Sequence, residues 1–354
     1  MSQGRTLIVG GGLCGLALAN MLEDAGADYL LVEARDRFGG RIETAQIDNG
    51  IFDLGPAWFW PGQPRMAALI ARLGLEKFTQ YAEGMISIED AQGHVQHGRG
   101  QMPMQGSFRL RGGLSALTDA LAARLPPNRK CLNCPVTSMQ RDAGIITVQF
   151  ADGAEQTADR VVLALPPRLA AQITYAPALP ATALGAMQQR DTWMAGQAKA
   201  VVVYKTPFWR EAGHSGDVMS RTGPMVEIHD TSASDSGPFA LFGFIGVPPQ
   251  LRMDTQVLER QIVTQLARIF GTPAESPEAV VIKDWAQDAY TATSMDLVPS
   301  GSHGEPTSLP EARTLWEGTL VVSGSETASQ FSGYLEGALQ AAETSFGHVT
   351  SQGN

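Results

Sequence analysis

Two short apolar runs flank a longer segment with helical spacing near the start of the chain. The runs are Thr6–Val9 and Tyr29–Val32, and each predicts a buried strand. Between them, Leu13–Ala25 places apolar side chains three and four positions apart and is followed by Gly26, which favours a helix that ends there. The pattern predicts a strand, a helix and a second strand in succession, as in a parallel sheet.

The later chain repeats apolar runs of strand length between turn signals. The stretch ITVQFADGAEQTADRVVLALPP predicts a hairpin that turns at Asp152–Gly153 and a buried strand Val161–Leu165 that ends at Pro166. The stretch GTLVVSGSETA predicts another short strand that leads into a Gly-Ser turn. Thr255–Phe270 is the clearest helix of the second half. Together these elements predict an α/β fold.

Three glycines lie in the turn between the first strand and the first helix, in the spacing G-x-G-x-x-G. Gly10 permits a tight turn, Gly12 lets a pyrophosphate approach the backbone, and Gly15 lets the helix lie close to the strand. The free N–H groups of the helix start attract phosphate. Glu33 ends the second strand, where a carboxylate accepts a hydrogen bond from a ribose hydroxyl. The unit predicts a dinucleotide site, and the acid disfavours the 2′-phosphate of NADP.

A second pair of glycines follows the acid. Gly39 and Gly40 let the chain pass close to a ligand, and Arg41 can bind a phosphate as a fork. The alternative is a polar hairpin with a surface arginine. Both FAD and NAD are bound by the glycine fingerprint, so these residues alone leave the cofactor open.

Composition narrows the class of protein. The chain has 354 residues, which suits two connected domains, and its net charge of −10 disfavours nucleic acid as a partner. We find no signal peptide and no apolar run of the roughly 18 residues that a membrane span needs. Three cysteines fit a reducing compartment. We therefore expect a cytoplasmic protein.

Two residue pairs that suggest metal sites lack the remaining ligands. Cys131 and Cys134 form one C-x-x-C, but a zinc site would need a second pair, and Pro135–Thr137 reads as the start of a strand rather than the helix of a redox motif. His94 and His97 lie in a glycine-rich turn without a third ligand. We expect no metal, and the absence of a G-x-S-x-G motif disfavours a hydrolase.

Several motifs, taken in order along the chain, resemble the flavin-dependent amine oxidases, the group of monoamine and polyamine oxidases. The matching residues are Gly10, Gly12 and Gly15, Glu33-Ala34-Arg35, Gly39-Gly40-Arg41, Asp53-Leu54-Gly55-Pro56-Ala57, Gly112-Gly113, Lys199, Pro207-Phe208-Trp209, Trp285, Gly324-Ser325-Glu326-Thr327-Ala328 and Ser332 to Ala338. The resemblance implies a Rossmann-like FAD-binding domain, discontinuous over residues 1–76, 107–170 and 312–354. A smaller mixed-sheet substrate domain would comprise residues 77–106 and 171–311.

The resemblance also implies a role for many residues in binding FAD. The glycine turn and Arg41 would hold the pyrophosphate, Glu33 the adenosine ribose, and the backbone of Val136 the adenine. Gly55 to Trp58 would pass along the isoalloxazine ring. The full set is Gly10, Gly12, Leu13, Cys14, Gly15, Glu33, Ala34, Arg35, Gly40, Arg41, Gly55, Pro56, Ala57, Trp58, Val136, Trp285, Gly324, Ser325, Glu326, Gly333, Tyr334 and Leu335.

Two residues are candidates for a catalytic role. Lys199 stands at the mouth of the apolar run Val201–Val203, so its ammonium either reaches solvent or points into a polar interior. The resemblance implies that it holds a water near the flavin N5 and assists reoxidation, whereas Lys205 reads as an exposed lysine at the strand end. Tyr334 would form one wall of an aromatic cage that aligns an amine; the alternative is a core tyrosine.

The chain departs from the family pattern in two places. Ser294 and Met295 stand where monoamine oxidases have a flavin-linking cysteine and the second cage aromatic. Serine forms no thioether, so we expect noncovalent FAD, and Trp285 or Tyr290 would have to replace the aromatic. The long helical insertion expected between Gly100 and Gly112 is missing, so the pocket would be more open or completed by a partner subunit.

The function implied by the resemblance is oxidation of an amine. A hydride equivalent would pass from the C–H bond beside the nitrogen to flavin N5, the imine would leave, and O2 or another acceptor would reoxidise the flavin. The alternative is a flavin desaturase that acts on a C–C bond of a non-amine substrate. A third possibility is an FAD-binding subunit without activity, which the presence of both Lys199 and Tyr334 disfavours.

Overall fold

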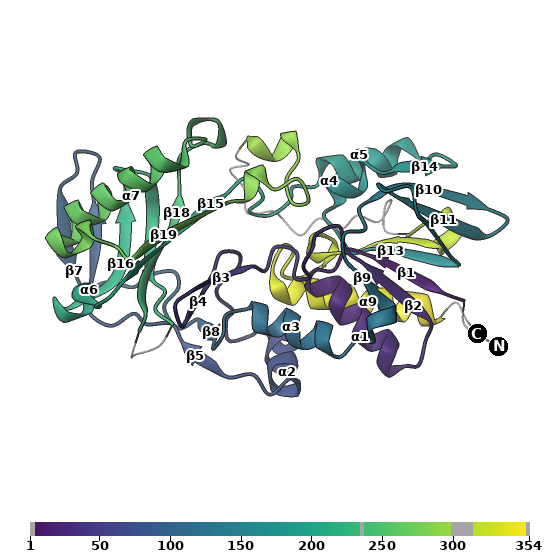
Figure 1. Ribbon diagram of the computed structural model, residues 1–354, viewed down its shortest axis with the longest axis horizontal. Coiled ribbons are helices and arrows are strands. Elements are labelled where there is room, and N and C mark those ends of the chain that lie inside the picture. The colour runs from purple at the N-terminus through teal and green to yellow at the C-terminus, as the bar shows by residue number, and fades with distance from the viewer. Residues whose placement is uncertain (1–3, 234–236, 299–313, 352–354) are drawn as a thin grey trace.

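The computed structural model describes residues 4–233, 237–298 and 314–351. Two large sheets lie at opposite ends of the molecule, as Figure 1 shows. The sheet at the right of that view contains the first strand of the chain, packs against the first helix and carries the predicted dinucleotide motif. The sheet at the left carries Lys199.

The first large sheet has six strands in the order β20-β21-β13-β1-β2-β9. All its neighbours pair in parallel except β20 and β21, which are antiparallel. Its central strands are buried along their whole length, as a parallel sheet covered on both faces requires. The bounds are β1 Thr6–Val9, β2 Tyr29–Val32, β9 Lys130–Cys131, β13 Arg160–Leu163, β20 Thr314–Leu315 and β21 Leu320–Val322.

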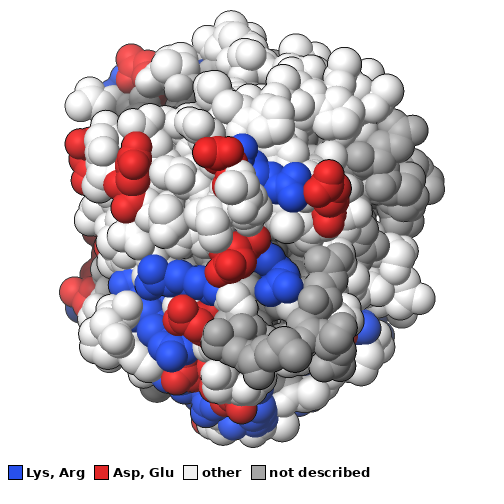
Figure 2. Space-filling model, turned by 90° about the vertical axis from the view of Figure 1, so that its right-hand side faces the viewer, with Lys and Arg blue, Asp and Glu red and all other residues white. Residues whose placement is uncertain are grey.

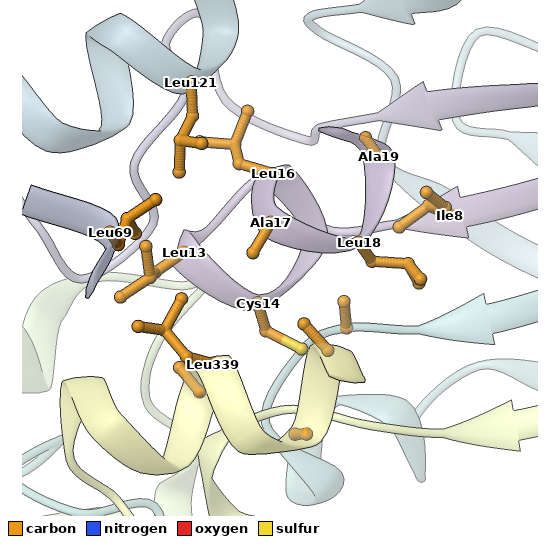
Figure 3. Packing of buried hydrophobic residues seen from close by; sticks show 14 of the residues in the cluster. Ile8, Leu13, Cys14, Leu16, Ala17, Leu18, Ala19, Leu69, Leu121 and Leu339 are labelled. Carbon is orange, nitrogen blue, oxygen red and sulfur yellow. The ribbon is translucent and has the colours of Figure 1, made fainter. Parts of the chain in front are cut away.

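Helices cover one face of this sheet, and a smaller sheet lies against the other. Figure 3 shows the first layer, in which Leu13 and Cys14 of α1 meet Leu339 of α9. On the other face, Met139 and Val148 pack with Ala183 of α5. The helices of the first layer are α1 Leu13–Asp24, α2 Pro64–Arg72, α3 Ser115–Ala123 and α9 Leu335–Ser351. On the other face, α4 Pro167–Ala170 and α5 Ala181–Gln189 pack with the smaller sheet. The smaller sheet contains β10 Val136–Asp142, β11 Ile145–Phe150, β12 Glu155–Ala158 and β14 Thr174–Ala176.

The second large sheet has seven strands in the order β19-β15-β18-β17-β16-β6-β7, antiparallel except for the pair β16 and β6. Helix α7 packs on one face through Leu258, Ile262 and Leu266. The other face packs on Trp58. The bounds are β6 Met85–Glu89, β7 Val95–Gly98, β15 Ala198–Tyr204, β16 His214–Ser220, β17 Met225–Asp230, β18 Phe239–Ile245, β19 Ala279–Asp284, α6 Phe208–Glu211 and α7 Thr255–Phe270.

Two strand pairs form small sheets of their own. They are β3 Thr44–Ile47 with β4 Gly50–Asp53, and β5 Lys77–Thr79 with β8 Phe108–Leu110. Among the described residues, no helix is both long and apolar enough to cross a bilayer. On the face drawn in Figure 2, acidic and basic side chains lie among one another rather than in one basic surface.

Most elements expected from the sequence are present, with small differences at their ends. The strands Thr6–Val9 and Tyr29–Val32 and the helix Thr255–Phe270 are confirmed. The first helix ends one residue earlier, at Asp24. The strand β13 covers Arg160–Leu163 rather than Val161–Leu165, and Ala164 and Leu165 beyond its end line a cavity.

The histidine pair is only partly the solvated loop that we expected. His94 lies in the turn between β6 and β7, but His97 belongs to β7. The ring of His97 shares a hydrogen bond of 3.0 Å with the Ser87 hydroxyl and lies 4.4 Å from the ring of His214. The predicted turn is present at His94, but it is shorter than expected and does not include His97.

The expected division into two domains stays a prediction. The strands of the six-stranded sheet all fall within the segments assigned to the FAD-binding domain, and those of the seven-stranded sheet within the substrate domain. Two strands do not follow that division. β14 pairs with β10, and β5 pairs with β8, each across a proposed boundary.

Candidate active site

One cavity of about 1610 Å³ extends from the start of α1 to the seven-stranded sheet. Every cofactor residue expected from the sequence lines it except Gly15. Lys199 lines it as well. Segments far apart in the chain, from Gly10 to Leu335, thus converge on one space.

The glycine turn has the shape that the motif demands. A Cβ on Gly15 would lie 1.9 Å from the Gly10 carbonyl oxygen, so only glycine lets α1 start against β1. A Cβ on Gly12 would meet nothing closer than 3.9 Å, which leaves space beside the first N–H groups of the helix. Gly15 therefore acts through packing, while Gly12 borders the cavity.

Glu33 is fixed at the end of β2 by two backbone donors. The carboxylate accepts hydrogen bonds from the N–H of Gly11 at 2.6 Å and from that of Arg35 at 2.9 Å. The guanidinium of Arg35 donates to Asp288 at 2.6 Å and to Thr291 at 2.9 Å. Burial opposes the charge of Asp288, but Arg35 lowers the pKa of this carboxyl below its ordinary value. Arg35 thus joins the dinucleotide motif to the segment after β19.

Arg41 lines the cavity, where it connects the pair Gly39-Gly40 to the motif that begins at Gly324. Its guanidinium pairs with the buried carboxylate of Glu326 at 2.6 Å and donates to the Ser325 hydroxyl at 3.1 Å. The side chain of Arg41 is 27% exposed and lines the cavity, so it is not a surface arginine on a polar hairpin. Residues 41 and 326 are brought together from opposite ends of the chain.

Lys199 points inward. It lies within β15 rather than before it, and the residue is only 5% exposed. Its ammonium donates a hydrogen bond of 2.5 Å to the Gly55 carbonyl and lies over the rings of Phe242 and Phe244, at 5.5 and 5.2 Å from their centres. Burial lowers the pKa of Lys199 to about 8, and the nearby Asp53 opposes this shift. Lys205 is exposed just after the strand, as expected.

Asp53 is a second buried ionisable group, close to Lys199 but not among the residues that line the cavity. One carboxylate oxygen accepts a hydrogen bond of 2.7 Å from the Leu114 N–H, and the described residues offer the other no donor. Burial raises the pKa of Asp53 to about 6, while the charges of Arg109 and Lys199 oppose this rise. Asp53 and Lys199 therefore influence each other's protonation.

Tyr334 stands in the cavity with aromatic partners that the sequence did not indicate. Its ring lies 6.1 Å from that of Trp193 at an angle of 26°, and 6.4 Å from that of Trp60 at 79°. All three residues line the cavity, and Tyr334 is 37% exposed rather than part of the core. Trp193 follows a helix in a polar stretch, and nothing in its spacing marks it.

The three residues considered for the position of the second cage aromatic do not all line the cavity. Trp285 and Tyr290 both line the cavity, and the indole of Trp285 is anchored by a hydrogen bond of 3.0 Å to the Leu54 carbonyl. Met295 does not line it and is 51% exposed. Met295 stands at the second aromatic position in the sequence but does not take that place in the cavity, because residues 294–297 form a short 3₁₀ turn that leaves this side chain outside.

An acidic group in the cavity wall was not predicted from the sequence. Glu227 lines the cavity from β17, and its carboxylate is hydrogen-bonded to the buried His229. The signal was present, since Glu227, His229 and Asp230 are polar residues within a strand that is otherwise apolar. Such residues must find partners inside the fold.

The cavity is suited to a dinucleotide with an apolar ring system. Its first part has the glycine turn, the start of α1 and Glu33, and its second part has aromatic walls and Lys199. Open space beside Gly12 leaves room for a phosphate where a side chain would otherwise stand. The donors and the shape thus fit FAD.

Comparison with known proteins identifies the family. A family model described as "Flavin containing amine oxidoreductase" matches residues 13–103 and 84–345. The chain belongs to this family, and its cofactor is FAD. It is an FAD-dependent oxidoreductase.

The similar proteins are amine oxidases and a dehydrogenase. The chain is 25% identical to a probable flavin-containing monoamine oxidase A of Dictyostelium discoideum, over 94% of each chain. It is 22% identical to a putrescine oxidase of Kocuria rosea, over 98% of this chain and 95% of that one. It is 23% identical to an L-amino acid dehydrogenase of Synechocystis, over 95% and 93%. A structure of wild-type putrescine oxidase bound to putrescine superposes with a TM-score of 0.82 at 22% identity, over 99% of both chains, and establishes the fold.

The comparisons also bear on the length of the chain. The alignment with the Dictyostelium protein extends over 439 positions, more than the 354 residues of this chain, so that relative has segments that this chain lacks. The two segments matched by the family model overlap over residues 84–103, beside the place where we expected the helical insertion to be missing.

Proposed function

We propose that the protein oxidises a small amine to an imine and passes the electrons to O2. The observation that carries this proposal is the shared cavity in which a buried lysine, Lys199, lies with an aromatic wall formed by Tyr334, Trp193 and Trp60. When bound, FAD supplies the acceptor, at N5, for the hydride of the C–H bond beside the amine nitrogen.

In this proposal the chain holds FAD without a covalent bond. Ser294 replaces the linking cysteine, and serine forms no thioether. The start of α1 and Arg41 bind the pyrophosphate, Glu33 binds the adenosine ribose, and the backbone of Val136 contacts the adenine. The remaining contacts come from Leu13, Cys14, Ala34, Arg35, Gly40, Gly55, Pro56, Ala57, Trp58, Trp285, Gly324, Ser325, Glu326, Gly333 and Leu335.

Two residues act on the substrate and on the acceptor. Tyr334 and its aromatic partners exclude water and align the amine nitrogen, because flat apolar rings pack against the hydrocarbon part of an alkyl amine. Lys199 holds a water at the reaction centre and provides a positive charge close to where O2 is reduced. The Gly55 carbonyl fixes the lysine there.

Anaerobic mixing with amines tests the proposal. The holoprotein is mixed with primary and secondary amines, and the visible band of oxidised flavin is followed. Bleaching by an amine, followed by recovery when air is admitted, is the expected result. Recovery only with an artificial electron acceptor would make the protein an amine dehydrogenase. No bleaching by any amine, with flavin present, would contradict amine oxidation and favour a C–C desaturase.

A further inference from the structure

The seven-stranded sheet carries an acidic residue in line with Lys199. In the strand register, Lys199 of β15 pairs with Phe244 of β18, and Phe244 pairs with Glu227 of β17. Residues that pair across neighbouring strands point to the same face of a sheet. The Cα atoms of Lys199 and Glu227 are therefore separated by two strand spacings, about 10 Å. Both residues line the same cavity.

The carboxylate of Glu227 is held by a buried group behind it. The imidazole of His229 bonds to Glu227 Oε1 through Nε2 at 2.7 Å and to Asp217 through Nδ1 at 2.7 Å. His229 is fully buried, and its ring lies edge-on to Trp58 with the centres 5.4 Å apart. The described residues offer Glu227 Oε2 no hydrogen bond, and the Glu227 side chain is 21% exposed.

The three groups together keep a negative charge beside the cavity. Burial favours a neutral imidazole, but the hydrogen bonds to Asp217 and Glu227 raise the pKa of His229 above its ordinary value. With the ring charged, one positive and two negative groups leave a net charge of −1. Asp217 is buried, whereas Glu227 faces the cavity, so this charge is available to a ligand only at Glu227.

The wall between Lys199 and Glu227 is apolar. Phe244 lies between them in the register, and Trp58 and Val226 line the cavity nearby. Such a wall suits methylene groups rather than polar ones. The cavity therefore presents a reaction centre at one point, a hydrocarbon surface beside it, and an anion at the far end.

We propose that Glu227 binds a second cationic group of the substrate, and that the preferred substrates are flexible primary diamines rather than monoamines. The inference rests on the proposed amine oxidation and specifies its substrate class. One amino group is oxidised at the aromatic wall around Tyr334, while the other, as an ammonium, donates to Oε2 of Glu227. His229 and Asp217 position this carboxylate and do not touch the substrate.

Binding to the reduced enzyme tests the inference without catalysis. In the anaerobic, dithionite-reduced holoprotein, no amine is oxidised, so calorimetric titration measures affinity alone. Terminal diamines from propane to hexane are compared with n-alkylamines of the same length. A charged hydrogen bond is worth roughly 1.5–3 kcal/mol, so the best diamine should bind about tenfold to a hundredfold more tightly than its monoamine. Equal affinity for both classes would overturn the inference.

A neutral variant of the same shape tests whether Glu227 is the group that binds the second ammonium. In Glu227→Gln, the ratio of kcat/KM for the best diamine to that for its monoamine should fall by about tenfold to a hundredfold. Glu155→Gln is the matched control, since it removes one negative charge from an exposed strand position outside the cavity and should leave the ratio as in the wild type. Flavin content and circular dichroism verify folding.

The outcomes separate this inference from the proposed function. Oxidation of monoamines and diamines at similar rates, with no change of the ratio in Glu227→Gln, would leave amine oxidation intact and refute the role of Glu227. An enzyme that oxidises no amine and binds neither class would refute both. A high diamine preference that survives in Glu227→Gln would place the anion elsewhere and overturn the assignment.

Discussion

The ammonium of Lys199 is enclosed by aromatic rings and one carbonyl, an environment that ordinarily disfavours charge. The sequence drew attention to this residue because a lysine beside a valine run must have either an outlet or a polar partner. It could not reveal the partner, since Gly55 is 144 residues away and contributes only its backbone. Asp53 was noted merely as part of a motif, although it raises the pKa of Lys199.

Replacing the lysine should slow flavin reoxidation and leave flavin bound. In Lys199→Met, we expect the second-order rate with O2 to fall by roughly a hundredfold, because a preorganised positive charge is lost at the reaction centre. Stopped-flow mixing of reduced enzyme with O2 measures it. Lys205→Met, at the exposed strand end, is the control and should reoxidise as the wild type does. An unchanged rate in Lys199→Met would refute the role given to Lys199.

The rate of flavin reoxidation by O2 should also depend on pH. The ammonium of Lys199 is present below its pKa of about 8 and is lost above it, so the reoxidation rate should fall as pH rises through about 8. Asp53→Asn removes the negative charge that raises this pKa, and the fall should then occur at a lower pH. Stopped-flow rates from pH 6 to pH 10 measure both profiles. A shift to higher pH in the variant would contradict the coupling.

The elements that the sequence predicted best are those whose pattern is local. β1, β2 and α7 have the bounds expected from their apolar patterns. In the structure the side chain of Asp254 caps α7 by accepting from the Val257 N–H at 3.0 Å. Elements defined by distant partners were harder. The order of the seven strands, and the contact of β5 with β8, depend on chain segments that are remote in sequence.

The close packing of helix α1 against β1 can be tested by substitution of Gly15. Gly15→Ala places a methyl group against the Gly10 carbonyl, so α1 must move away from β1, and the free energy of unfolding should fall by about 1–3 kcal/mol with weaker FAD binding. Gly185→Ala, in α5, has open space at the same atom and should be neutral or up to about 1 kcal/mol stabilising. Urea unfolding of the two variants compares them. Equal stability would contradict the tight packing of α1.

At the scale of the whole molecule, the sequence predicted the family and the convergence of its motifs on one cavity. It could not predict the aromatic neighbours of Tyr334, because Trp193 and Trp60 reach it from segments with no shared pattern. It left open whether Met295 replaces the second aromatic, since an alignment position does not determine which way a short turn directs its side chains. The sequence indicated the missing insertion only through the short distance along the chain between Gly100 and Gly112.

The attachment of FAD can be tested on the whole protein. Since we propose that Ser294 stands in place of the linking cysteine, acid precipitation should release all of the flavin into a yellow supernatant and leave a colourless pellet. Absorbance of the two fractions measures the distribution, with the acid-denatured supernatant of a free FAD standard as reference. Flavin retained in the pellet after washing would show a covalent bond and contradict the prediction.

The order of segments along the chain also governs how the protein is made. The six-stranded sheet begins with β1 and β2, but β21 and α9, which packs on α1, follow the entire seven-stranded sheet in the chain. During translation the early strands emerge before the segment that completes their sheet, and Arg41 has no ion-pair partner until Glu326 has been synthesised. The nascent chain must therefore keep a half-built nucleotide site from aggregating until the ribosome has passed the substrate sheet. FAD capture becomes a late event, coupled to the final stage of synthesis.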